Sequence, residues 1–283
     1  MSSPSPETPN APDVAESTQD ARSLDQGIGP DPAQIRQACN RFRILVVGRA
    51  NAGKTTLLKK FCQSKEEPDV WNERGEQIGA SVVNPSVDRG IHNINHEITY
   101  RSNPSFVFHD SMGIESGSSV HSRAIHDFLQ DRDQNTDLEK RVHAIWFCVP
   151  AGQARVLGDT ELEFFKHSTN GIPVIVIFTK WDMEIKNAVN ALRNQGKTRQ
   201  QGKTEAPQYA REHFQQLHVI QNTPYPPRSY IYLQDMHQPD TDCSELSTVT
   251  AQVLDDGVVK MLFISRQLVC DRLSAEWAIR CDR

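Results

Sequence analysis

The residues best suited to chemistry lie in three short stretches of this 283-residue chain, and the first is G-R-A-N-A-G-K-T-T at residues 48–56. It fits G-x-x-x-x-G-K-[ST], a loop whose glycines let several backbone N–H groups turn towards one anion. In such a loop Lys54 reaches the β- and γ-phosphates of a nucleotide, and Thr55 offers its hydroxyl to Mg²⁺. We therefore predict a phosphate-binding loop formed by Gly48, Arg49, Ala50, Asn51, Ala52, Gly53, Lys54, Thr55 and Thr56.

The alternative is a chance match in an ordinary strand, turn and helix. The flanking sequence argues against it, because an apolar run at residues 44–47 precedes the loop and a helical pattern at 55–63 follows it. A strand before and a helix after are the context that the motif requires, and the helix N-terminus also favours bound anions.

The second stretch is D-S-M-G at residues 110–113, directly after a short apolar strand at 106–108. D-x-x-G is a weak pattern alone, but downstream of a phosphate loop it matches a carboxylate on the Mg²⁺ side and a γ-phosphate-sensing glycine. We expect Asp110 to support Mg²⁺ through water and the Gly113 N–H to meet the γ-phosphate. Lys54, Thr55 and Gly113 are then the candidate catalytic residues.

The third stretch is T-K-W-D at residues 179–182, which follows the apolar run V-I-V-I-F. A carboxylate here can accept both the N1–H and the exocyclic amine of guanine, a donor pair that adenine lacks. Thr179, Lys180 and Asp182 are thus candidate nucleotide-binding residues. Asp182 is the candidate guanine acceptor, while the Lys180 stem lies against the base or braces the phosphate loop. The alternative is a surface T-K-W-D without a ligand, and the order of the three motifs argues against it.

The elements that must position these motifs alternate between strands and helices. Apolar runs predict strands at residues 44–47, 106–108, 142–149, 174–178 and 230–233, and alternation predicts an edge strand at 92–100. Helices are expected at 55–63, at 159–166, 184–218, 245–267 and 268–279, and from the end of a polar stretch at 116–119 to about residue 129. The predicted fold is α/β: a three-layer P-loop NTPase fold with a mostly parallel six-stranded sheet, one antiparallel edge strand and helices on both faces.

Two polar segments interrupt this pattern. Residues 65–90 are turn-rich and predict a mobile loop, while residues 193–205 (R-N-Q-G-K-T-R-Q-Q-G-K-T-E) predict an exposed excursion. The positive charges of the excursion suit a solvated loop or an acidic or nucleic-acid partner. His92 and His96 do not indicate a metal site, since four strand residues span about 13 Å.

Composition and charge predict how the chain divides into domains. Residues 1–38 are rich in Ser, Pro and Asp, and their six acidic residues and two arginines give −4 of the chain's net charge of −5. We predict a disordered acidic tail at 1–38, a nucleotide-binding domain at 41–267 and a C-terminal helical extension at 268–283. The nearly neutral remainder does not support nucleic-acid binding, and the lack of a long apolar run or signal peptide predicts a cytoplasmic protein without a membrane partner.

Taken together, the phosphate loop, D-x-x-G and T-K-x-D resemble the G domain of P-loop GTPases of the translation-factor-related class, over roughly residues 41–267. G-R-A-N-A-G-K-T-T is similar to the loops of Era-like and tRNA-modification GTPases, and T-K-W-D to septin-like and immune-associated GTPases. Residues 89–98, 108–118 and 143–150 are similar to uncharacterised G-domain proteins of fungi. The resemblance implies a GTP/GDP site with Mg²⁺, and GTP hydrolysis that acts as a molecular switch.

Three positions depart from that family. Ile114 stands where Ras-type enzymes have a water-orienting glutamine, Ser86 is the nearest candidate for the switch hydroxyl that binds metal, and residues 234–236 (Q-D-M) replace the S-A-K base loop. We expect slow hydrolysis without an activator. Asn51 either caps its own loop or, as the resemblance implies, holds K⁺ as a further cofactor.

Other functions stay open at this point. The chain is a GTPase, a hydrolysis-deficient GTP-dependent interaction module, or an ATPase or small-molecule kinase, against which Asp182 argues. An unknown protein effector or activator is expected as a partner, and a homodimer is compatible with the sequence.

Overall fold

The computed structural model describes residues 40–79, 93–111, 119–153, 156–257 and 259–267. Their centre is an eight-stranded sheet in the order β3-β2-β4-β5-β1-β6-β7-β8, in which β5, β1, β6, β7 and β8 are parallel. The strands are β1 Phe42–Gly48, β2 Asp69–Trp71, β3 Gln77–Ile78, β4 Glu97–Tyr100, β5 Asn103–Asp110, β6 Ala144–Pro150, β7 Val174–Thr179 and β8 Ser229–Tyr232.

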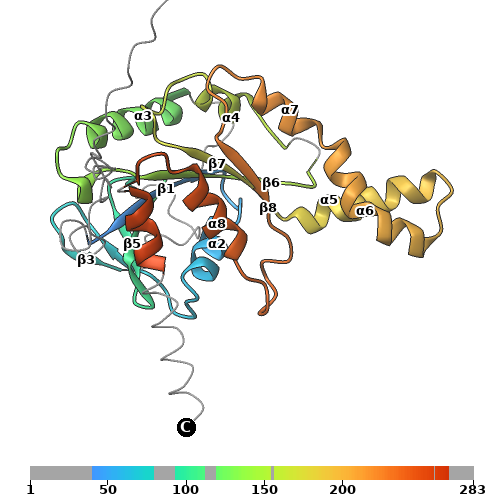
Figure 1. Cartoon of the computed structure of the whole chain (residues 1–283), viewed down its shortest axis with the longest axis horizontal. Helices are drawn as coiled ribbons and strands as arrows, with labels where there is room; N and C mark the ends of the chain where they lie inside the picture. The colour runs from blue at the N-terminus through green and yellow to red at the C-terminus, as the bar shows by residue number, and fades with distance from the viewer. Residues whose placement is uncertain (1–39, 80–92, 112–118, 154–155, 258, 268–283) are drawn as a thin grey trace, which may run out of the picture.

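Helices cover both faces of the sheet (Figure 1). They are α2 Lys54–Phe61, α3 Ser119–Asp133, α4 Asp159–Phe164, α5 Trp181–Asn194, α6 Arg199–His213, α7 Gln215–Gln221 and α8 Ser244–Val253, with a short 3₁₀ turn, η2, at Leu138–Lys140. Residues 259–267 are also helical. The three-layer P-loop NTPase fold expected from the sequence is confirmed.

Strand β1 shows how the two cores form. All seven of its residues are buried, as expected for a strand inside a parallel sheet. Ile44 and Val46 face a cluster that includes α2 and α8, whereas Leu45 and Val47 face a cluster that includes α3 and α4. Alternate residues therefore hold opposite helical layers, and the carboxyl ends of β1, β5, β6 and β7 meet at one edge of the sheet.

The sheet has two strands more than the sequence predicted. Part of the segment expected to be a loop forms the hairpin β2–β3, whose turn is closed by the Asn72 side chain and by Gly75 at φ 75°. β2 pairs with β4, and the Trp71 indole N–H donates to the Thr99 hydroxyl at 3.1 Å. β4 is thus not the edge strand, because β2 satisfies its outer backbone groups.

The bounds of two other elements also differ from those predicted. β4 begins at Glu97 rather than near residue 92, since a turn closed by the His96 N–H and the Asn93 carbonyl comes first; residue 92 lies outside the described part. The helix expected over residues 245–267 is interrupted after α8, where Asp256 accepts the N–H of Val259 and caps the next helical segment. Residues 1–38 and 268–283, predicted as a tail and a helical extension, are likewise outside the described residues.

The polar segment 193–205, expected to be an exposed excursion within the helix predicted over 184–218, is mostly exposed but largely helical. Thr198 and Gln201 form a capping box at the start of α6, and Gly202, Ala206 and Ala210 are buried. Small residues let α6 lie close to α5, whose Ala188 and Leu192 belong to the same cluster. Figure 1 shows α5 and α6 as a helical pair projecting beyond the β8 side of the sheet.

Candidate functional site

The predicted phosphate loop lies between β1 and α2, at the carboxyl edge of the sheet. Gly48 has a φ of 153°, and a Cβ at this position would lie 2.5 Å from the Cys148 carbonyl oxygen, so β1 and β6 approach too closely for a side chain. Gly53 and Asn51 also have positive φ, at 84° and 61°. The loop then enters α2, whose first N–H groups have no intrahelical acceptor and are available to phosphate oxygens.

Lys54 is almost buried within this loop. Its ammonium donates to the carbonyl oxygens of Gly48 at 2.8 Å and Arg49 at 3.2 Å, and it lies 3.5 Å from a carboxylate oxygen of Asp110. The structure therefore brings the first and second motifs together. Thr55, in the first turn of α2, and Asp110, at the end of β5, carry oxygen donors of the kind that Mg²⁺ prefers.

Thr179 joins the third motif to the loop. Its buried hydroxyl donates to the Ala52 carbonyl oxygen at 2.7 Å, across 127 residues of sequence. The side chain of Thr179 therefore holds the loop, rather than pointing outwards to a ligand. Lys180 follows in a left-handed conformation, φ 55°, and α5 begins at the next residue.

Asp182 lies in the first turn of α5 and faces the loop after β8. Partial burial alone would raise the pKa of Asp182, but hydrogen bonds from Lys186 at 3.0 Å and from the Asp235 backbone outweigh burial and lower it. The carboxylate is thus ionised and beside residues 234–236, the segment expected to replace the base loop. Asp235 itself has a φ of 53°, and its carbonyl oxygen accepts from Gln238 N–H and the Thr241 hydroxyl.

Three positions of interest lie outside the described residues: Ser86, Gly113 and Ile114. Their predicted roles stay predictions. Two contacts had no counterpart in the sequence reasoning, the ion pair between Arg49 and Glu161 and the approach of the Asp235 backbone to Asp182. For the Arg49–Glu161 ion pair, the sequence offered only the presence of Glu161 at the third position of a capped helix.

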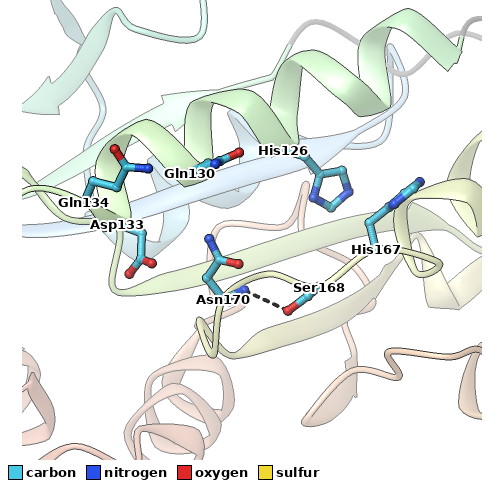
Figure 2. Close-up of a pocket in the computed structure, with 7 residues that line it drawn as sticks. All are labelled: His126, Gln130, Asp133, Gln134, His167, Ser168 and Asn170. Carbon is cyan, nitrogen blue, oxygen red and sulfur yellow. Dashed lines mark hydrogen bonds between the residues drawn. The ribbon is translucent and has the colours of Figure 1, made fainter.

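A hollow of about 580 Å³ lies elsewhere, between α3 and the segment that joins α4 to β7. Figure 2 shows the His126 ring on α3 turned towards His167, with ring centroids 5.1 Å apart. Among the residues that the structure describes, its lining is polar and contains no lysine or arginine: His126, Gln130, Asp133, Gln134, His167, Ser168 and Asn170. The hollow therefore lacks the cations that a triphosphate needs, and the three motifs do not meet there.

The loop, strand order and helix arrangement define a P-loop NTPase. The family model described as "50S ribosome-binding GTPase" matches residues 43–180, which contain the first two motifs and the first two residues of the third. Over these residues the chain is similar to a P-loop GTPase domain, a G domain. Among curated proteins, none matches the sequence.

Two solved structures are among those similar to the chain. One is translation elongation factor SelB from Methanococcus maripaludis in complex with the GTP analogue GPPNHP, at 14% identity and TM-score 0.37, covering 77% of this chain and 34% of that one. The other is the G domain of the FeoB iron transporter from T. maritima, at 16% identity and TM-score 0.29, covering 62% of this chain and 99% of that one. The chain thus corresponds to about a third of the length of the first structure.

Proposed function

We propose that this protein is a molecular switch that binds GTP with Mg²⁺, hydrolyses it slowly and signals its state to a protein effector. The observation that carries the proposal is the meeting of Lys54, Asp110 and the Thr179-anchored loop at the carboxyl ends of β1, β5 and β7. Ligands of open α/β sheets bind at this edge.

In the proposed mechanism, Lys54 leaves its loop carbonyls and pairs with the β- and γ-phosphates. Bound Mg²⁺ would supply charge neutralisation at the β- and γ-phosphate oxygens. Thr55, Asp110 and Ser86 would hold it, the Gly113 N–H would meet the γ-phosphate, and Asp182 would select guanine. Phosphoryl transfer to water depends mainly on such positioning and electrostatics.

The position after D-x-x-G is Ile114, whose side chain cannot orient water by hydrogen bonding. We propose that the exposed Asn51 would hold K⁺, which would supply charge neutralisation in the transition state comparable to that of an arginine finger. Ile114 also favours a second candidate function, a GTP-dependent interaction module that does not hydrolyse its nucleotide.

One experiment separates these functions. Binding of GTP, GDP and ATP is measured by competition with a fluorescent GDP, and phosphate release is then followed in KCl and NaCl at matched ionic strength. We expect guanine-selective binding and hydrolysis several-fold faster in K⁺, lost in Asn51→Ala while GTP binding persists. Guanine-nucleotide binding without phosphate release would support the interaction module instead. Competition by ATP as strong as that by GTP would overturn guanine selectivity.

A further inference from the structure

The phosphate loop is anchored at both ends by side chains of other elements. At its C-terminal end, the Thr179 hydroxyl holds the Ala52 carbonyl. At its N-terminal end, the Arg49 guanidinium forms an ion pair with Glu161 of α4 and donates to the Val156 carbonyl oxygen at 3.3 Å. Between the anchors, Ala50 and Asn51 are exposed. Both ends of the turn are therefore fixed while its middle faces solvent.

The Glu161 side chain is buried and both of its carboxylate oxygens have partners. Its side chain is only 4% exposed, one carboxylate oxygen meets Arg49, and the other accepts the Gly158 N–H at 2.9 Å. A buried carboxylate without a cation is strongly unfavourable, so Glu161 restrains the direction of the Arg49 side chain.

The backbone of Arg49 links this contact to the site. Its carbonyl oxygen accepts the Ala52 N–H at 3.2 Å, which closes the loop's turn, and also the Lys54 ammonium at 3.2 Å. The residue that Glu161 holds by its side chain thus sets both the turn and the starting position of Lys54.

We propose that Glu161 is a positioning residue for nucleotide binding, acting through Arg49 to hold the phosphate loop in its binding shape. This inference rests on the proposed nucleotide site. Because the backbone of such a loop cradles the α- and β-phosphates, which GDP and GTP share, Glu161 supports binding of both nucleotides equally.

The test compares two isosteric substitutions on the same helix. Glu163 is the matched control, since it lies two residues along α4 and pairs only near the surface, with Lys166 and His167. Glu161→Gln should weaken GDP and GTP by about tenfold each, the equivalent of about 1.4 kcal/mol, and Glu163→Gln should bind both like the wild type. Glu161→Gln binding both nucleotides with wild-type affinity would overturn the inference.

A double variant separates positioning from stability. Arg49→Met with Glu161→Gln removes both charges of the buried pair, so it should melt close to the wild type yet bind as weakly as Glu161→Gln alone. Wild-type affinity in the double variant would mean that the ion pair serves folding only. If the wild type itself bound no guanine nucleotide, the proposed function would fail; binding in the wild type with no loss in these variants overturns only the role of Glu161.

Discussion

Asp182 is the residue on which base selection depends. It is held ionised by Lys186 and the Asp235 backbone, so a full negative charge faces the expected position of the base. Asp182→Ala would leave two guanine donors unpaired, at about 2 to 4 kcal/mol or roughly 30- to 1000-fold in GTP affinity. Isothermal titration with GTP measures this loss.

Two comparisons sharpen that prediction. Asp182→Asn should shift preference towards xanthine nucleotides, because its amide donates where the carboxylate accepted. Lys186→Ala keeps the carboxylate and should bind GTP nearly as the wild type does. GTP affinity in Asp182→Ala within a factor of two of the wild type would refute the assignment.

At the residue level, the sequence predicted the site residues that belong to short motifs, which can be recognised from a few neighbouring residues. Glycine spacing, Lys54 and the strand before T-K-W-D are all visible within a few residues. The Arg49–Glu161 pair was missed because the two residues are 112 positions apart, and neither residue type nor periodicity reports such a contact. Similarly, Thr179 was expected at the ligand, whereas the fold turns its hydroxyl onto Ala52.

Among the elements, the buried strands were the most predictable. β1, β6 and β7 are apolar on both faces because helices cover both sides, and such runs are readable without knowing their partners. The β2–β3 hairpin was missed, and the start of α6 was expected to be an exposed excursion although the helix predicted over residues 184–218 includes the rest of α6. Both segments are short in apolar residues. They depend on cross-strand contacts with β4 and on a capping box, which outweigh composition.

The capping box of α6 gives a prediction for one element. Thr198→Ala removes the hydroxyl that accepts the Gln201 N–H, and should destabilise α6 by about 1 kcal/mol. Amide exchange in α6 should therefore speed up roughly fivefold, while β1 exchange stays unchanged. Thr204→Ala is the control, because its exposed hydroxyl bonds only back to the Gln200 carbonyl within the helix. Equal protection of α6 in both variants would contradict a role for the cap.

Across the whole molecule, buried histidines join distant parts of the sheet through Arg43. The Arg43 backbone N–H donates to His143 Nδ1 at 2.9 Å, and its guanidinium lies 3.1 Å from His109 Nε2. The opposite ring nitrogens face the carbonyl oxygens of Leu138 and Ile94. Each ring thus accepts from Arg43 on one side and donates on the other, which requires both histidines to be neutral.

This arrangement predicts a loss of stability in mild acid. Burial, together with the charges of Arg43 and Arg132, lowers the pKa of His109 to about 3. Burial likewise lowers the pKa of His143 to about 4, aided by Arg43 and Arg141, although its hydrogen bond with the Leu138 carbonyl oxygen raises that pKa. Because both folded-state pKa values lie below the ordinary 6.5, the unfolded chain binds more protons, so stability is full above pH 6.5 and falls towards pH 4. Urea unfolding at pH 7.5, 6 and 5 should show that the free energy of unfolding falls by on the order of 3 kcal/mol by pH 5.

His143→Asn keeps an acceptor for the Arg43 N–H but cannot titrate, so it should make the free energy of unfolding depend less on pH. The exposed His213→Gln should not change that dependence. Identical unfolding free energies of the wild type at pH 7.5 and 5 would show that these histidines do not govern its acid sensitivity.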